Sequence, residues 1–175
     1  MTLAQPQPGE YAEAYAHYLG TPVQGDVLTL LETQAAELGL LFRRFSDSQA
    51  LHRYAPGKWS LKDLLQHLTD TERMFTYRCL RIGRGDTAPL PGFDENAFAA
   101  AAQSDGRPLG LLLVDFQAAR AASLALFRSL PEAAWLNPGT TNGRQVTARC
   151  MPYFALAHAA HHLAVVRERY LPGLM

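Results

Sequence analysis

Apolar residues recur with the period of an α-helix in four stretches of this chain, and that repeat limits the fold more than any other feature. Long helices are expected from about Val23 to Phe45, Leu61 to Ile82, Leu109 to Ser129 and Thr147 to Tyr170. No stretch alternates apolar and polar residues for long enough to indicate a half-buried strand. The pattern therefore predicts an all-α protein without a sheet.

Capping residues and breaks separate the four stretches. Ser60 and Asp63 resemble a capping box at the start of the second helix, and Thr147 is expected to cap the last one. The Pro- and Gly-rich segment 83–98 is long enough to cross the end of a bundle, whereas NPGTTNGR, residues 137–144, is expected to be a loop. Four long helices with a longer crossover between the second and third describe a four-helix bundle.

The chain length and charge indicate one domain without an attraction for polyanions. The 175 residues fit a single domain, with residues 1–22 as an N-terminal extension and a core of about 23–171. Sixteen basic residues balance sixteen acidic ones, so no overall field draws the protein to nucleic acid or to an anionic membrane. Neither is expected as a partner.

Features of the two cysteines and of the apolar segments predict a cytoplasmic location. Cys79 and Cys150 lie inside helical patterns, which fits a reduced interior better than a secreted disulfide framework. The N-terminus lacks the pattern of a signal peptide. The longest uncharged run, residues 150–166, contains Pro152 and three histidines, so it is not expected to span a membrane.

Three histidines within five positions of the last helix need an explanation. His158 and His162 are four residues apart, which places both rings on one helical face at the spacing that can hold one metal ion. His67 of the second helix is the best candidate for a third ligand. His161 lies about 100° round the helix from His162 and is expected either to be structural or to support a ligand from behind. The alternative is that these rings only make hydrogen bonds in the core.

Two familiar metal chemistries are excluded by the neighbouring residues. A zincin needs a glutamate directly after the first histidine, and that position is Ala159. A di-iron bundle needs Glu-x-x-His pairs on two helices, and the chain lacks a set that supplies four inward carboxylates. A mononuclear site with three neutral nitrogen ligands and open positions remains, and it suits one divalent ion such as nickel or zinc.

The segments PGKWSLKDLLQHLTDTERMF, RGDTAPLPGFDENAF and HAAHHLAVVRERYL occur in this order. Together they resemble the DinB-like superfamily, the damage-inducible and YfiT-like metal-binding bundles, over about residues 26–171. The resemblance implies an up-down-down-up bundle, often a homodimer, whose metal ligands fall on His67, His158 and His162. It also implies thiol chemistry, because some relatives are S-transferases that use bacillithiol, mycothiol or glutathione, and one is a mycothiol-dependent maleylpyruvate isomerase. It identifies no thiol-binding residues in this chain.

Other side chains are candidates for roles beside the metal. Glu72 falls within the apolar stripe of the second helix and could accept a proton. Arg78, Arg81 and Arg84 could bind the anionic group of a carboxylated thiol, although a row of arginines on a helix is also typical of a solvated face.

Three functions follow from the predicted site. The first is a transferase in which the metal activates a low-molecular-weight thiol for attack on a small electrophile. The second is a hydrolase that uses metal-bound water as hydroxide, with Glu72 as proton acceptor. The third is a non-catalytic, stress-inducible module with a structural metal, for which a fourth protein ligand would be expected.

Overall fold

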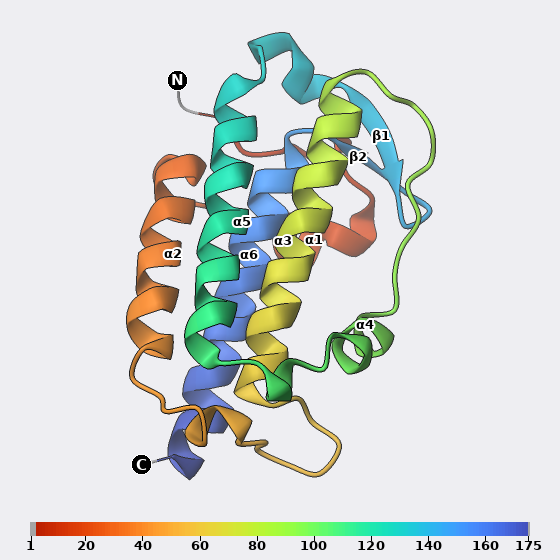
Figure 1. Ribbon diagram of the computed structural model, residues 1–175. Helices are drawn as coiled ribbons and strands as arrows, with labels where there is room; N and C mark the ends of the chain where they lie inside the picture. The colour runs from red at the N-terminus through yellow and green to blue at the C-terminus, as the bar shows by residue number, and fades with distance from the viewer. Residues whose placement is uncertain (1–2, 175) are drawn as a thin grey trace.

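The computed structural model describes residues 3–174 and contains four long helices that lie side by side in a bundle (Figure 1). They are α2 (Val27–Phe42), α3 (Leu61–Gly83), α5 (Leu109–Ser129) and α6 (Cys150–Val165). Shorter helical segments are η1 (Glu13–Tyr15), α1 (Ala16–Leu19), η2 (Gln49–Leu51), α4 (Glu95–Ala102), η3 (Ser104–Gly106), η4 (Glu132–Leu136), the π-helical η5 (Val166–Tyr170) and η6 (Leu171–Gly173). The prediction of a mostly helical four-helix bundle is confirmed.

The long helices differ in direction. In Figure 1, α2 and α6 run toward the bottom of the view, whereas α3 and α5 run toward the top. The segment between α3 and α5 therefore descends along the side of the bundle and carries α4 on its way. Helices α2 and α3 each pack against both α5 and α6.

The predicted caps explain where several helices begin. Ser60 and Asp63 form the complete capping box of α3, and each side chain accepts from the other's backbone N–H. The carboxylate of Asp94 accepts from the backbone of Asn96 and Ala97 at the start of α4. Helix α5 has the bounds expected from the sequence.

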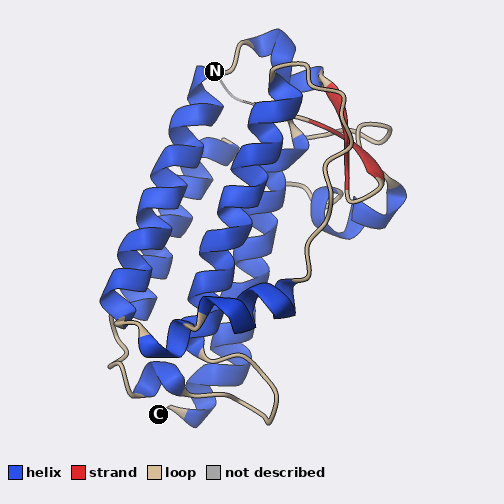
Figure 2. Ribbon diagram, turned by 45° about the vertical axis from the view of Figure 1, so that its right-hand side comes forward, coloured by secondary structure: helices blue, strands red, loops and turns tan. Residues whose placement is uncertain are grey.

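A two-stranded hairpin contradicts the prediction of a protein without a sheet. Strands β1 (Pro138–Thr141) and β2 (Arg144–Thr147) pair antiparallel where a loop was expected, and Figure 2 shows them beside the bundle. Asn142 and Gly143 both have positive φ, 52° and 71°, as a tight type I′ hairpin turn requires. The Asn-Gly dipeptide is the sequence signal for this turn, and the loop prediction overlooked it.

The predicted cap of the last helix is also wrong. Thr147 lies at the end of β2, and α6 begins three residues later at Cys150, without a side-chain cap. The Thr147 hydroxyl instead donates to the Glu10 carboxylate at 2.9 Å, and Arg149 forms an ion pair with the same carboxylate. The hairpin therefore includes the residue that was predicted to cap the helix.

The described part of the N-terminal segment packs against the bundle. Leu3 and Leu19 are buried in the same cluster as residues of α2 and α6. The Tyr153 hydroxyl of α6 donates to the Leu3 carbonyl at 2.8 Å. Residues 3–22 therefore do more than extend the core, and they place two tyrosines, Tyr15 and Tyr18, beside it.

A buried ion pair joins three helices at the centre of the bundle. Arg120 of α5 is 1% exposed and donates from Nε and Nη2 to the two oxygens of Glu72, each at 2.9 Å. Its Nη1 donates to the Leu31 carbonyl at 2.9 Å and to Gln34 Oε1 at 3.3 Å. Among the described helices, α5 is the one with the length and hydropathy of a membrane span, but its buried face carries this charged group, as in the core helix of a bundle.

Candidate metal centre

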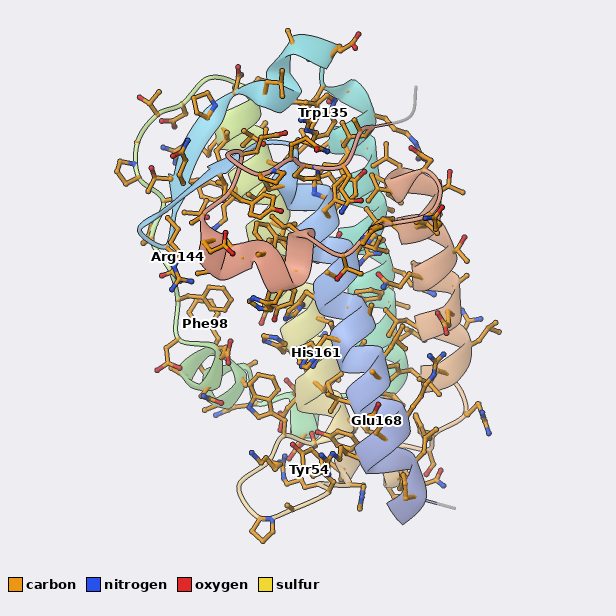
Figure 3. All side chains as sticks on the ribbon, turned by 180° about the vertical axis from the view of Figure 1, so that it is seen from behind. Tyr54, Phe98, Trp135, Arg144, His161 and Glu168 are labelled. Carbon is orange, nitrogen blue, oxygen red and sulfur yellow. The ribbon has the colours of Figure 1, made fainter. Side chains whose placement is uncertain are left out.

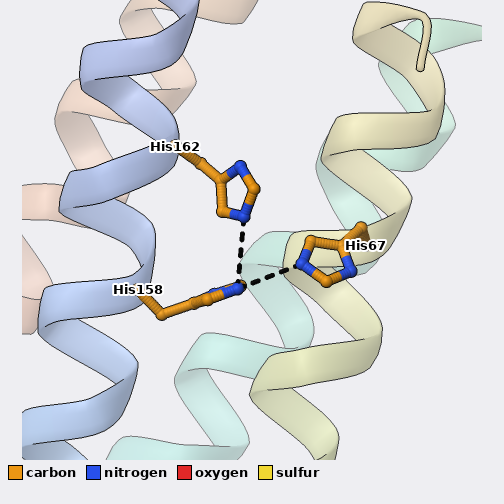
Figure 4. Close-up of side chains that lie close together, drawn as sticks. All are labelled: His67, His158 and His162. Carbon is orange, nitrogen blue, oxygen red and sulfur yellow. Dashed lines mark hydrogen bonds between the residues drawn. The ribbon is translucent and has the colours of Figure 1, made fainter. Parts of the chain in front are cut away.

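Helices α3 and α6 bring His67, His158 and His162 together, and Figure 4 shows the three rings pointing at one another. The Nε2 atom of His158 lies 3.0 Å from Nε2 of His67 and 3.2 Å from Nε2 of His162. One nitrogen from each ring lies within 4.8 Å of the others. The one-turn spacing on α6 and the packing of α3 against it therefore produce the cluster that the sequence predicts.

Aromatic side chains and a threonine hold the rings in place. The ring of Trp59, just before α3, lies 4.6 Å from that of His67 and 6.4 Å, stacked, from that of His162. Phe75 lies edge-on to His158 with ring centroids 6.0 Å apart. The Thr71 hydroxyl donates to the His67 carbonyl at 2.7 Å and lies 3.5 Å from its Nε2. These contacts leave the Nε2 edges turned toward each other.

Burial keeps all three rings uncharged. It lowers the pKa of His67 to about 4. It also lowers the pKa of His162 to about 3 and that of His158 to about 2, with a further contribution from the positive charge that the neighbouring rings would carry. Each ring is thus neutral near pH 7, the state in which an imidazole nitrogen offers its lone pair to a metal.

The donor set fits a divalent transition metal. Two nitrogens that bind one tetrahedral zinc ion at about 2.0–2.1 Å are about 3.3 Å apart, close to the two separations of 3.0 and 3.2 Å in the cluster. Nε2 of His162 lies within hydrogen-bond distance of His158, whereas its buried Nδ1 has no hydrogen-bond partner among the described residues. Imidazole nitrogens suit zinc and nickel among the first-row metals.

Two cavities adjoin the cluster. One, of about 220 Å³, is lined by His67 and His158, and the other, of about 380 Å³, by His162, His161 and Trp59. The three rings therefore lie between two spaces that a ligand could enter. No carboxylate or thiol of the described residues completes a four-ligand group with them, so the protein alone supplies three donors.

The smaller cavity extends from the histidines along α3 and α6. We call it the aromatic cavity, because five aromatic side chains line it besides the two histidines: Tyr15, Tyr18, Phe75, Phe93 and Phe154. Its polar lining comes from Thr71, Arg78, Glu95, Thr141 and Asn142. The tyrosines and the hairpin residues were not predicted, since a site prediction built on the long helices does not include segments that reach it only through tertiary packing.

The other predicted site residues lie in different surroundings. Glu72 is 3% exposed, and both its oxygens accept hydrogen bonds from Arg120. Its role as proton acceptor stays a prediction. Arg78 is buried and lines the aromatic cavity. Arg81 pairs with Asp86 and Tyr77, and Arg84 is exposed at the end of α3.

The three arginines therefore do not face one common surface, and only Arg78 reaches the aromatic cavity. His161 is exposed on α6 (Figure 3), and its ring does not belong to the group of converging donors. Its exclusion from the ligand set stays a prediction.

The chain matches a known family, and its fold matches solved structures. The family model of the DinB superfamily matches residues 30–166. The structure is similar to that of YfiT from Bacillus subtilis, a probable metal-dependent hydrolase with an unusual four-helix bundle topology, with a TM-score of 0.74 and 20% identity over 85% of this chain and 90% of YfiT.

A second solved structure, the mycothiol-dependent maleylpyruvate isomerase, is similar with a TM-score of 0.68 and 16% identity. The match covers 84% of this chain but 61% of the isomerase, which is the longer protein. Curated protein sequences give no significant match. At these identities the two structures show a shared fold.

Proposed function

We propose that this chain, which belongs to the DinB superfamily, is a metal-dependent enzyme. Its His67, His158 and His162 hold one divalent ion, nickel or zinc. The observation that carries the proposal is the convergence of three neutral imidazole nitrogens beside a cavity with aromatic walls. The course of the long helices in Figure 1 supports the up-down-down-up order, with the long crossover between α3 and α5, as part of this proposal.

The reaction that we propose is transfer of a low-molecular-weight thiol, of the bacillithiol, mycothiol or glutathione type, to a small electrophile. A bound ion would lower the pKa of the thiol so that the thiolate forms near neutral pH. The name of the isomerase relative, which depends on mycothiol, supports a thiol partner. A homodimer in the cytoplasm, with a role in stress response, completes the proposal and rests on the family resemblance.

The chain's own residues fit this division of tasks. The three rings position the ion, Trp59 shields two of them, and the aromatic cavity holds the organic part of the ligand. Neither cysteine can act as nucleophile in place of an external thiol, because both are buried. Burial raises the pKa of Cys79 to about 12, and it also raises that of Cys150.

Hydrolysis is the second candidate, and the description of YfiT as a probable metal-dependent hydrolase favours it. Glu72 is a poor fit to the proton acceptor that this reaction needs, since Arg120 binds both its oxygens. A structural ion in a non-catalytic module would be expected to have a fourth protein ligand, and the donor group contains three residues of the described chain.

A thiol-consumption assay tests the proposal. The protein loaded with zinc or nickel is incubated with chlorodinitrobenzene and, in turn, with glutathione, mycothiol or bacillithiol. We expect one thiol to be consumed faster than with metal-free protein, and the His158→Ala variant to lose this rate while His161→Ala keeps it. Ester cleavage by the loaded protein without any thiol consumption would favour the hydrolase instead.

A further inference from the structure

Arg78 is a buried cation without a buried anion. Its side chain is 9% exposed, yet no carboxylate of the described residues pairs with it. Nη2 donates to the Pro91 carbonyl at 2.9 Å, whereas the buried Nε has no hydrogen-bond partner among residues 3–174. A guanidinium stays charged inside a protein, and leaving its donors unpaired is unfavourable. Among the described residues only the Pro91 carbonyl accepts from this guanidinium, so the group keeps donors that a ligand in the cavity could use.

The position of Arg78 relates it to the histidines. His67, Thr71, Phe75 and Arg78 are spaced four, four and three residues apart, so they follow one face of α3, and all four line the aromatic cavity. The backbone rise from His67 to Arg78 is about 16 Å, and the arginine side chain is the longer of the two, so it can reach back along the helix toward the histidine. One elongated ligand could therefore reach both the histidines and Arg78.

Helix α6 repeats this arrangement on the opposite wall. Met151, Phe154 and His158 follow one face of α6 and line the same cavity. The rings of Phe75 and Phe154 stack across it with centroids 5.8 Å apart. The middle of the cavity is thus apolar, between nitrogen donors at one end and a guanidinium at the other.

The remaining charges leave the cation at Arg78 dominant within the cavity. Glu95 is the acidic residue among the described lining residues, and it is exposed at the start of α4, where solvent screens it. Tyr15 lies near Arg78, and its hydroxyl can donate to an anion. Burial lowers the pKa of Arg78, because its charge has lost water without gaining an ion pair.

We propose that the aromatic cavity binds an elongated organic carboxylate, with the carboxylate on Arg78 and the reacting group at the three histidines. The second half of this statement rests on the proposed function, whereas the carboxylate site at Arg78 does not. The carboxylate could belong to the thiol or to the electrophile, and both would present the same chemistry to the guanidinium. Arg78 acts here as a binding residue.

The test compares matched carboxylate and amide probes by calorimetry on zinc-loaded protein. The thiol pair is mercaptohexanoate and mercaptohexanamide, each with the thiol at the far end of the chain, and the pair without a thiol is phenylhexanoate and phenylhexanamide. The variants are Arg78→Met, Arg78→Gln, whose amide can still donate to the Pro91 carbonyl, and the control Arg81→Met. Zinc per chain and the unfolding midpoint are measured for each.

We expect the parent protein to bind at least one carboxylate about tenfold or more tightly than its amide, as a charge-assisted hydrogen bond predicts. Arg78→Met and Arg78→Gln should remove that preference and leave zinc and the affinity for the amides unchanged. Arg81→Met should keep the preference. A preference in the thiol pair assigns the carboxylate to the thiol, and a preference only in the phenyl pair assigns it to the electrophile.

Equal affinities within both pairs, or a preference that survives in the Arg78 variants, would overturn the carboxylate site. If Arg78→Met does not fold, Arg78→Gln and the preference of the parent decide the question. The two proposals can also fail separately. If the thiols bind without any preference for a carboxylate, the proposed function stands and the carboxylate site fails. If phenylhexanoate binds through Arg78 and no thiol binds, the carboxylate site stands and the proposed function fails.

Discussion

Two buried arginines of this bundle, Arg120 and Arg78, show how the same side chain can serve opposite purposes. Arg120 donates from all three nitrogens to Glu72, Gln34 and a backbone carbonyl, so its charge is matched inside the protein. Arg78 makes one bond to a backbone carbonyl, and its buried Nε makes none. The first arginine completes the core, while the second leaves a donor for something from outside.

The same contrast separates the two sides of α3. Toward α2 and α5, its polar side chain Glu72 is fully bonded in the core. Toward α6, His67 joins a group whose member His162 has an unpartnered Nδ1. A single helix thus carries a closed polar network on one face and an open one on another. Two of the four buried polar atoms without a partner among the described residues belong to Arg78 and His162, which line the cavities at the candidate site.

The largest effect is expected at the open face, where removal of one ring leaves at most two metal ligands. His67→Ala, His158→Ala and His162→Ala should each abolish stoichiometric metal binding, and the matched control His161→Ala should retain it. Metal per chain after desalting, with identical loading, measures this. If His161→Ala loses the ion while His67→Ala keeps it, the ligands lie on another face of α6.

Acid should destabilise the metal-free protein through the same three rings. Their folded-state pKa values of about 4, 2 and 3 lie below the usual value, so the unfolded chain binds more protons as the pH falls from about 6.5 toward 4. The stability is fully present above about pH 6.5 and is lost on acidification by about 1.4 kcal/mol per ring per pH unit.

Urea unfolding of the metal-free protein at about pH 7 and about pH 5 measures this slope. In the His67→Leu variant one ring is gone, so the loss of stability between the two conditions should be smaller by the contribution of one proton. An identical slope in parent and variant would show that His67 has the same pKa in the folded protein as in the unfolded chain.

At the closed face, breaking the ion pair should cost stability without touching the metal. Glu72→Ala leaves the Arg120 charge buried and unpaired, and we expect the free energy of unfolding to fall by about 3–5 kcal/mol. The double variant Glu72→Met/Arg120→Met should recover much of that loss. Arg78→Met removes a charge that already lacks a partner, so it should cost far less than Glu72→Ala. Equal losses of unfolding free energy in Glu72→Ala and Arg78→Met would show that the two arginines do not differ in this way.

The smallest effect is expected at Gly143, in the turn of the hairpin whose residues Thr141 and Asn142 line the aromatic cavity with Arg78. Gly143 has φ of 71°, and a Cβ built there meets nothing within 4 Å, so Gly143→Ala introduces only backbone strain. We expect about 1 kcal/mol of destabilisation in chemical unfolding. Metal per chain should be unchanged, and a loss of metal would mean that the hairpin supports the histidines as well as the aromatic cavity.

The sequence predicts the parts of this molecule that depend on local patterns. The bounds of α5, the capping box at Ser60 and the convergence of His67 with His158 all follow from helical periodicity and spacing. The hairpin carries a local signal too, the Asn-Gly turn, but its strands are only four residues each and give little alternation.

Long-range packing accounts for what could not be predicted. The pairing of Glu72 with Arg120 joins residues 48 apart, and no pattern along α3 indicates whether its carboxylate is free or matched. Tyr15 and Tyr18 reach the aromatic cavity because the N-terminal segment folds back onto α6, where Tyr15 and Phe154 lie with ring centroids 4.9 Å apart. Such contacts depend on the complete fold.

The sequence separation within the histidine cluster determines the stage of folding at which the protein can bind the ion. His158 and His162 form a local pair as soon as α6 is helical, but His67 is 91 residues away from His158 and joins them only when α3 has docked. The full set of ligands is therefore a late product of folding. An ion that needs all three rings will slow the unfolding of a finished protein more than it speeds the folding of a new chain.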